Sequence, residues 1–498
     1  MGRVPPGHAR SGQVTDPHHD RPLGPDRHRR LPGTSGLETT GASGLTAGAR
    51  GSMSAMTAPA LVATRSERIG WYSYDWAISA FRATVITVFL GPYLTTIAER
   101  AAGPDGLVPV LGVPVATGSL FTYTVSASVL LTVPLLPLVG ALADRSSHKK
   151  RLLALFAYIG AGSVIAMVFL TGDRYLLGAG LLLIANIAYG AAKVVFNSYL
   201  PQLAGPDDRD RVSSFSWAIG YIGGGILLVI NLGALLSLDE RYSGTVARWS
   251  IVSAGVWWAV FTTVAIARLR DLPAVAGEHD RGHPLIDGFR QLGHTLRSAR
   301  AYPLTLFFLA AYLIYNDGIQ TVITVATIYA DQQLHLDQSI QIATILLVQF
   351  VAFGGAWMLG RIAERFGAWR TIAASLVVWC VAVGLAYPLP ERQPVLFMLL
   401  GALIGIVLGG SQALSRSLFS QMIPRGSEAE YFGLYEISSD GTSWLGPLLF
   451  GLAFQLTGTY RIAIASTLVF FVAGLVMLLL VPVRRAIEAA GNTPPKVL

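Results

Sequence analysis

Residues 140–151 read GALADRSSHKKR and connect two long apolar segments of the chain. Gly140 allows two helix ends to approach each other closely, because it has no side chain. Asp144 stands where its carboxylate can meet the positive amino-terminal end of a helix from another part of the chain. The basic residues that follow are typical of a loop held on the cytoplasmic side of a membrane. The alternative is an ordinary inside loop that is basic for topology alone.

The composition predicts that most of the chain lies in a membrane. The 498 residues are 52% hydrophobic and only 13% charged, whereas soluble proteins carry roughly 25% charged residues. This argues against a soluble multidomain enzyme. In a soluble protein the net charge of +8 would suggest a nucleic-acid partner, but here the basic residues serve topology and none is expected. The single cysteine, Cys380, excludes a disulfide framework and a Cys/His metal cluster.

Twelve apolar runs are long enough for helices that cross a bilayer, which need about 20 residues each. Strands of a membrane barrel would instead alternate polar and apolar residues over short segments. We therefore expect an all-α membrane protein embedded in the lipid bilayer. The predicted spans are 74–98, 118–142, 150–171, 176–199, 213–236, 249–269, 303–329, 338–360, 369–387, 394–415, 430–456 and 461–482. Within the eleventh span, Gly446 and Pro447 predict a kink.

The distribution of basic residues predicts the orientation. With the amino terminus in the cytoplasm, most of the 37 Lys and Arg residues lie in inside segments, as the positive-inside rule requires. Both termini are then cytoplasmic, and the cell membrane is the expected location. Trp71, Trp249 and Trp369 lie near span ends and are expected in the interfacial aromatic belts.

Residues 1–67 are expected to form a disordered basic tail. The stretch up to residue 52 is rich in Gly, Pro, Arg, His and Ser and cannot bury enough apolar surface to order itself. Two alternatives are that the natural start is Met53 or Met56, and that the tail contacts anionic lipid. At the other end of the chain, residues 484–498 are expected to form a short cytoplasmic tail.

A cytoplasmic linker, residues 271–302, is expected between six spans and six spans. Leu285, Phe289, Leu292 and Leu296 follow one another at helical spacing, which predicts an amphipathic helix on the inner membrane face. The alternative is a linker with a single helical turn.

An internal repeat predicts two similar six-helix bundles, residues 68–270 and 303–483. Three short stretches recur in order at corresponding spans. The pairs are 84–88 with 321–325 (TVITV in both), 140–145 with 360–365 (GALADR and GRIAER) and, more faintly, 198–202 with 417–421 (SYLPQ and SLFSQ).

The 140–151 stretch resembles the signature loop of the major facilitator superfamily, G-x-L-A-D-R-x-G-R-K, with Ser147 in place of a glycine. Three further stretches together resemble the vacuole-effluxer branch, which includes bacterial transporters and the fungal autophagy-related amino-acid effluxer. They are WYSYDWAISAF at 71–81, SFSWAIGYIGGGILLVINL at 214–232 and GGSQALSRSLFSQMIPRGSEAEYFG at 409–433. Ile78 departs from that pattern, which has Asn after Asp-Trp-Ala. The resemblance covers about 68–483 and implies a major facilitator fold. The expected conformational gate loops carry Gly140, Asp144, Arg145, Gly360, Glu364 and Arg365.

Polar and ionisable residues inside spans are expected to line a water-filled path, because they are costly in lipid. Asp317, near mid-membrane, is the main candidate for protonation during transport; alternatively it is a buried carboxyl paired with Arg82 or Arg416. Asp75 and Arg416 can instead be interfacial, and Lys193 can instead snorkel to the inner interface. The predicted pathway residues are Asp75, Arg82, Asn186, Lys193, Trp217, Tyr221, Tyr312, Asn316, Asp317, Gln320, Gln412, Arg416, Glu436 and Asp440.

These patterns predict a secondary active transporter. The sequence has no P-loop, HExxH or GxSxG motif, so we expect no enzymatic activity, no cofactor and no metal. The two halves of a monomer are expected to rock about a site near the bilayer midplane, coupled to protons through Asp317 or Asp75. The charged interior favours a small polar solute such as an amino acid, and the resemblance favours efflux. Alternatives are a multidrug exporter, which the interior charges disfavour, and a transporter-shaped solute sensor, for which the sequence offers no signalling domain.

Overall fold

The computed structural model describes residues 63–271, 300–440 and 445–498. Nearly all of the predicted tail, residues 1–67, lies outside the described residues. So does the predicted amphipathic helix within 271–302.

Eleven helical segments of the described residues are long and apolar enough to cross a membrane. The amino-terminal half, residues 63–271, contains α1 (Arg65–Ala80), η1 (Phe81–Phe89), α2 (Leu90–Ala101), η2 (Thr117–Ser119), α3 (Leu120–Arg145), α4 (Lys149–Ala166), η3 (Met167–Phe169), α5 (Tyr175–Asn197), α6 (Leu200–Leu203), α7 (Arg209–Ser237), η4 (Glu240–Tyr242) and α8 (Ser243–Arg268). The carboxy-terminal half, residues 300–498, contains α10 (Pro303–Gln332), α11 (Gln338–Phe366), α12 (Ala368–Ala386), α13 (Pro394–Gln421), α14 (Glu428–Asp440), α15 (Leu445–Thr457), α16 (Tyr460–Ser466), α17 (Leu468–Leu480) and α18 (Val483–Ala489).

The first span is one continuous helix with a change of winding in its middle. Its start is fixed by a capping box, in which the Thr64 hydroxyl accepts from the Glu67 N–H and the Glu67 carboxylate accepts from the Thr64 N–H. Glu67 also pairs with Arg270 beyond the end of α8, with Nη2 2.7 Å from Oε2, and this carboxylate raises the pKa of the Arg270 guanidinium. Between α1 and α2, η1 is a π-helix, a wider winding that the sequence pattern did not predict.

The eleventh predicted span, 430–456, is described as α14 and α15, and residues 441–444 between them lie outside the described part of the chain. Gly446, at the predicted kink, belongs to α15. A side chain at Gly446 would collide with Thr321 of α10, whose hydroxyl oxygen would lie only 1.5 Å from the added carbon. Glycine at this position therefore lets α15 pack directly on α10.

A β-hairpin follows the first span and is an addition to the predicted all-α fold. Strands β1 (Leu107–Val110) and β2 (Val113–Ala116) pair antiparallel, with Leu107 opposite Ala116. The turn residues Leu111 and Gly112 both have positive φ, 52° and 86°, as a two-residue hairpin turn requires. The hairpin defines one end of the helices, which we call the hairpin end. The opposite end, where α3 finishes, is called the Asp144 end.

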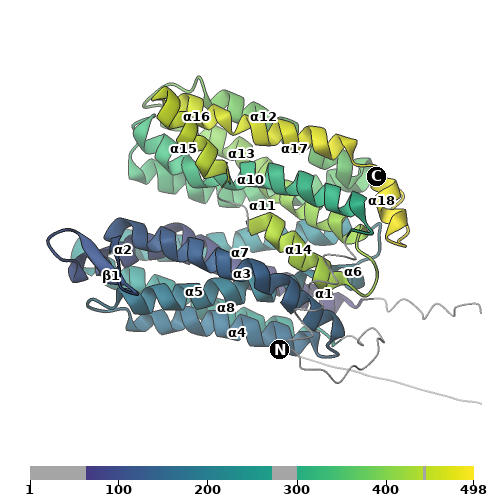
Figure 1. The fold of residues 1–498 in the computed structure, drawn as a ribbon, viewed down its shortest axis with the longest axis horizontal. Coiled ribbons are helices and arrows are strands. Elements are labelled where there is room, and N and C mark those ends of the chain that lie inside the picture. Colours follow the sequence, from purple (N-terminus) through teal and green to yellow (C-terminus); the bar gives the residue numbers. More distant parts are fainter. Residues whose placement is uncertain (1–62, 272–299, 441–444) are drawn as a thin grey trace, which may run out of the picture. The chain divides into compact units, whose positions relative to one another are not determined.

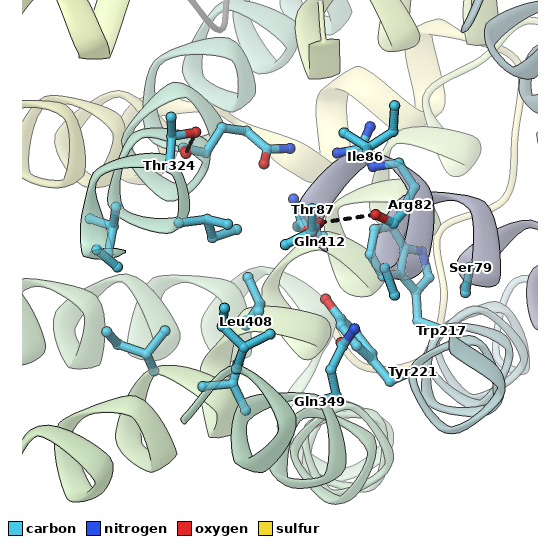
Figure 2. Close-up of a pocket in the computed structure, with 18 of the residues that line it drawn as sticks. Ser79, Arg82, Ile86, Thr87, Trp217, Tyr221, Thr324, Gln349, Leu408 and Gln412 are labelled. Atoms are coloured by element: carbon cyan, nitrogen blue, oxygen red, sulfur yellow. Dashed lines mark hydrogen bonds between the residues drawn. The ribbon is translucent and has the colours of Figure 1, made fainter. Parts of the chain in front are cut away.

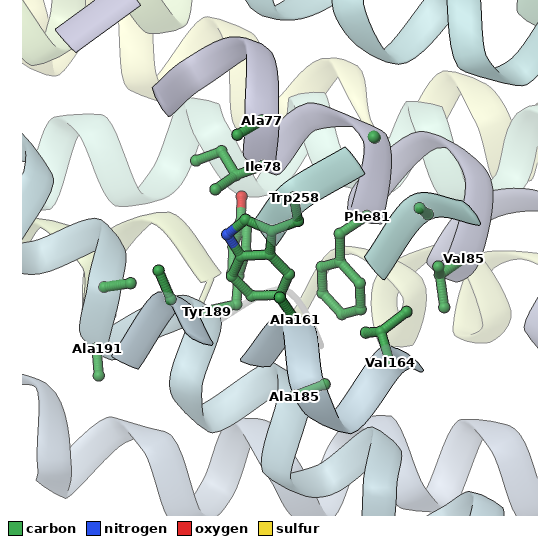
Figure 3. Close-up of a cluster of buried hydrophobic side chains, with 14 of the residues drawn as sticks. Ala77, Ile78, Phe81, Val85, Ala161, Val164, Ala185, Tyr189, Ala191 and Trp258 are labelled. Carbon is green, nitrogen blue, oxygen red and sulfur yellow. The ribbon is translucent and has the colours of Figure 1, made fainter. Parts of the chain in front are cut away.

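Buried hydrophobic side chains, with Phe81, Tyr189 and Trp258 among them, form the core of the amino-terminal half (Figure 3). Trp258 of α8 is fully buried, with its ring centroid 5.4 Å from that of Phe81 and 6.3 Å from that of Tyr189. Gly160 of α4 makes room for the indole, since a side-chain carbon there would lie 2.2 Å from it. The core thus holds Tyr189 in one position on α5.

The two halves form two helical bundles that meet along α3 with α14 and along α7 with α11 and α13 (Figure 1). Glycines from the repeated stretches lie at both contacts. A side-chain carbon on Gly140 would lie 2.3 Å from the Ala429 carbonyl oxygen, and one on Gly360 would lie 2.6 Å from the Ser214 Cβ. Corresponding positions of the repeat therefore bring corresponding helix pairs together.

Replacing Gly140 by alanine is expected to destabilise the protein. The added methyl group meets the backbone of α14, and overpacking of this kind typically costs about 1–3 kcal/mol. The measurement is thermal unfolding of the purified protein in detergent, with Gly162→Ala of α4 as the control, because an added carbon at Gly162 meets nothing within 4 Å. Equal melting temperatures for the two variants would contradict the assigned contact.

Candidate functional site

A cavity of about 660 Å³ lies between the two halves. Its lining comes from α1, η1, α3, α5 and α7 on one side and from α10, α11, α12, α13, α14 and α16 on the other. Figure 2 shows side chains from both halves, among them Arg82, Tyr221 and Gln412, around this space. A site built from both halves is the arrangement that alternating access requires.

Most of the predicted pathway residues line this cavity, and some lie behind its wall. The lining includes Asp75, Arg82, Lys193, Trp217, Tyr221, Tyr312, Gln320, Gln412, Arg416 and Glu436. Asn186, Asn316 and Asp317 are not among the lining residues. Asp440 belongs to α14, but its side chain lies outside the described part of the structure. Ile78, where the family pattern has Asn, also lines the cavity, so an apolar group occupies that part of the wall.

Five polar residues form the end of the cavity nearest the Asp144 end, and we call them the charged floor: Asp75, Lys193, Asn197, Arg416 and Glu436. Lys193 Nζ lies 2.8 Å from Glu436 Oε2, and Asn197 Nδ2 donates to Glu436 Oε1 at 2.6 Å. Asn197 Oδ1 in turn accepts from Arg416 Nη1 at 3.1 Å, and Arg416 pairs with Asp75 at 3.4 Å. Successive members come alternately from the two halves, so the charged floor joins the halves.

The Arg416 guanidinium is enclosed by groups of the amino-terminal half. Its Nε donates to the Ser213 hydroxyl at 2.9 Å, and Nη2 donates to the Ser213 carbonyl at 3.0 Å. Its Cζ lies 4.8 Å from the Trp71 ring centroid and 5.6 Å from that of Trp217, which adds cation–π attraction. Asp75 is held in place by a hydrogen bond from the Ser216 hydroxyl.

Trp71 therefore corrects one prediction. The sequence position predicts an interfacial belt residue, but the indole is fully buried and faces Arg416. Its Nε1 donates to the Phe196 carbonyl oxygen at 3.0 Å, which ties the first span to α5. Trp249, by contrast, is exposed, as a belt residue should be.

Arg82 and Lys193 both lie close to one aromatic ring. The Arg82 Cζ and the Lys193 Nζ are each 5.8 Å from the ring centroid of Tyr189. Arg82 belongs to the π-helical η1, and its carbonyl oxygen accepts from the Thr87 hydroxyl at 2.9 Å (Figure 2). π-helical turns are frequent at functional sites.

The two asparagines behind the wall have structural partners. Asn186 donates to the Ser128 hydroxyl at 2.9 Å and joins α5 to α3. Asn316 donates to the Ser439 carbonyl at 2.7 Å and accepts from Gln412 Nε2 at 2.9 Å. Asn316 therefore positions Gln412, which does line the cavity.

Asp317 is 1% exposed, and neither of its carboxylate oxygens makes a hydrogen bond of normal geometry among the described residues, although the backbone N–H of Gly446 lies near the carboxylate. The alternative in which Arg416 neutralises it is wrong, because Arg416 pairs with Asp75. An ionised carboxylate without normal hydrogen bonds is very costly to bury. The protonated form is accordingly favoured at this position.

The Asp144 carboxylate caps the start of α14, a helix of the other half. It accepts from the backbone N–H of Ala429 at 3.0 Å and of Glu430 at 2.9 Å, as the helix dipole favours. Lys149 also contacts it at 2.9 Å. In the second gate loop, Glu364 faces Arg211 at 3.6 Å. The two gate loops thus bridge the halves in different ways.

Further contacts close the Asp144 end. Arg209 donates to the Ser420 carbonyl at 2.9 Å, and the Ser417 hydroxyl donates to Asp210. Among the described residues, the hydrogen bonds between side chains of opposite halves lie on the Asp144 side of the cavity. Thr87 and Thr324, lining residues nearer the hairpin end, are exposed. The cavity is closed towards the Asp144 end.

Sequence reasoning groups Asn197 with Asn186, Tyr189 and Lys193 on one helix face, and Asn197 lines the cavity. It missed two serines of the site. Ser213 and Ser216 lie one turn apart along the face of α7 near Trp217, but serine in an apolar helix is a weak signal because it often bonds its own backbone.

Solved structures of major facilitator transporters share this architecture. The proton:xylose symporter XylE aligns with a TM-score of 0.61 and 15% identity, covering 84% of this chain and 95% of that one. The fucose transporter FucP in the outward conformation aligns with a TM-score of 0.58 and 11% identity, covering 83% and 99%. Two six-helix bundles around a central cavity therefore define an all-α membrane protein with the major facilitator fold, as predicted.

The family follows from sequence comparison. Residues 63–491 match the family described as "Vacuole effluxer Atg22 like". The MFS-type transporter YxiO of Bacillus subtilis (strain 168), itself uncharacterized, is 30% identical over 417 residues, covering 83% of this chain and 94% of YxiO. Autophagy-related protein 22 of Gibberella zeae is 28% identical over 511 residues, covering 80% and 76%. The chain belongs to the Atg22-like vacuole effluxer family and is an MFS-type transporter.

Replacing Arg416 by glutamine is expected to lower stability strongly, because it leaves the Asp75 charge uncompensated. Breaking a buried ion pair from one side costs about 3–5 kcal/mol. Adding Asp75→Asn to this variant should restore part of the lost stability, because the effects of two substitutions on the free energy of unfolding are not additive when the residues are paired. Thermal unfolding in detergent measures both, with Arg461→Gln at the hairpin end as control. Strict additivity of the two substitutions would contradict the pairing.

Proposed function

We propose that this transporter moves a small polar solute, with an amino acid as the first candidate, by alternating access and in exchange for protons. The observation that carries the proposal is the charged floor, in which cations and carboxylates from both halves line one cavity. A zwitterionic solute offers a partner to each sign of charge. The charged floor disfavours a multidrug exporter, although most of the remaining lining residues are apolar.

The direction proposed is efflux from the cytoplasm across the cell membrane. The family description, "Vacuole effluxer Atg22 like", supports efflux. The Asp144 end carries the basic loop at 145–151, and the positive-inside rule places it in the cytoplasm together with both termini. In that orientation the structure, closed at the Asp144 end, presents its cavity to the outside. One chain supplies both walls of the cavity, so a monomer is sufficient for transport.

Asp317 is the proposed proton carrier. Its burial without a hydrogen bond of normal geometry favours the protonated form in this conformation. It lies on α10 next to Asn316, whose bond to Gln412 leads to the cavity wall. A rearrangement that admits water to Asp317 would release the proton, because solvation favours the charged carboxylate. Asp75, a lining residue paired with Arg416, is the second candidate.

Transport in vesicles tests this proposal. The protein, reconstituted with an imposed pH gradient and offered a panel of radiolabelled amino acids, is expected to accumulate at least one of them against its gradient. Asp317→Asn should abolish accumulation driven by the pH gradient while counterflow exchange of the same amino acid continues. Asp331→Asn, an exposed carboxylate on the same helix α10, serves as the matched control. Accumulation that is independent of pH in the unsubstituted protein would overturn the proton coupling.

A further inference from the structure

We propose that the anionic group of the solute binds at Lys193 by taking the place of Glu436, and that this exchange loosens the contact between the two halves. The inference rests on the proposed transport function. It adds which group of the solute the protein recognises and which contact between the halves is broken when that group binds.

The lining residues give the cavity a positive balance. Arg82, Lys193 and Arg416 contribute cations, whereas Asp75 and Glu436 contribute the carboxylates among the described lining residues. Charges in a cleft with apolar walls focus their field on the enclosed space. The cavity therefore offers cations that an anionic group can contact.

The geometry directs that group to the space beside Tyr189. Arg82 and Lys193 are both 5.8 Å from the centre of this ring. An anionic group beside this ring is therefore close to two cations. The ring itself cannot yield, because Trp258 and Phe81 pack against it in the core.

Lys193 is the accessible cation of the charged floor, and Arg416 is not. The Lys193 side chain is 12% exposed, compared with 3% for Arg416. Arg416 is enclosed by Ser213, Trp71 and Trp217. A solute that enters the cavity thus meets the ammonium group of Lys193 while the guanidinium of Arg416 stays covered.

Exchange at Lys193 affects the contact between the halves. Glu436 belongs to the carboxy-terminal half, and its described partners, Lys193 and Asn197, belong to the other half. When the anionic group of the solute accepts the hydrogen bond from Lys193, Glu436 keeps only Asn197 of these two. A buried carboxylate that loses a charged partner is destabilised. Binding therefore favours separation of α14 from α5 and opening of the Asp144 end.

The apolar wall beyond the charged floor accommodates the rest of the solute. Leu400, Ile404 and Leu408 of α13, together with Ile345 and Val348 of α11, line it. The solute predicted by this arrangement carries a carboxylate or another oxyanion at one end. An ammonium group is not required for it to bind.

A cysteine accessibility assay on the full-length protein tests the contact without any solute. In a Cys380→Ser background, Ser420→Cys places a thiol at the closed Asp144 end, where Ser420 is 1% exposed and its carbonyl accepts from Arg209. Adding Glu436→Gln is expected to raise the maleimide labelling rate about tenfold, which corresponds to the loss of one modest charged interaction. The matched control is Glu391→Gln at the hairpin end. Equal rates in the two variants would overturn the proposal.

Two probes with the same phenylethyl body test the recognised group. 3-Phenylpropionate, an acid, should speed labelling of the thiol introduced by Ser420→Cys, and phenethylamine should not. The effect of the acid should persist in Lys193→Arg, which keeps the cation, and disappear in Lys193→Gln. No response to the acid, or the same response in Lys193→Gln, overturns the anion site. A response to the acid without amino-acid transport in vesicles would leave this site standing and overturn the proposed function alone.

Discussion

The structure depends on one interaction between its halves. The carboxy-terminal half contributes a buried guanidinium, and polar and aromatic groups of the amino-terminal half surround it. Arg416 belongs to α13, yet Ser213, Asn197, Asp75 and Trp71 of the amino-terminal half surround it. An arginine inside a membrane protein needs such partners, because the lipid offers none. Closing the Asp144 end and neutralising Arg416 are consequently the same event. Separation of the halves must expose this charge to water or provide it with new partners.

The two predicted gate loops have similar sequences, but their polar contacts between the halves differ in strength. Asp144 is buried and binds two backbone N–H groups at the start of α14, where the helix dipole and low solvent exposure both strengthen the contact. Glu364 and Arg211 occupy the corresponding position between α11 and α7 but are partly exposed, and exposed pairs contribute little. The close backbone approach through Gly140 and Gly360 is common to both. The repeat in the sequence is therefore reflected in the packing of the helices, whereas the polar contacts at corresponding positions differ.

Hydropathy predicted eleven of the twelve spans as continuous helical segments, because burial in lipid imposes a length and a composition on every helix. The internal repeat and the resemblance of the 140–151 loop predicted the fold. Local winding was not predictable. The pentapeptide TVITV is π-helical at 84–88 and α-helical at 321–325, so tertiary contacts decide between the two. The hairpin was missed because its strands are only four residues each.

The sequence predicts which residues share a helix face, but it does not predict which neighbouring helix each face meets. Periodicity identifies residues that share a face, such as Asp75 and Arg82, and both line the cavity. It does not say which neighbour covers a face. Asn186 therefore bonds α3 instead of facing the cavity, and Trp71 faces Arg416 instead of the membrane interface. Such outcomes depend on how helices distant in sequence are placed together.

The hairpin has a practical consequence for imaging. It is fixed to the helices by Tyr175, whose hydroxyl donates to the Pro109 carbonyl at 2.8 Å, and by the buried Val108, while the tip residue Leu111 is 98% exposed. A transporter with little mass outside the bilayer gives electron microscopists few features for aligning particles. A nanobody raised against this short, firmly held loop would supply such a fiducial mark on the hairpin end, away from the contacts that close the opposite end.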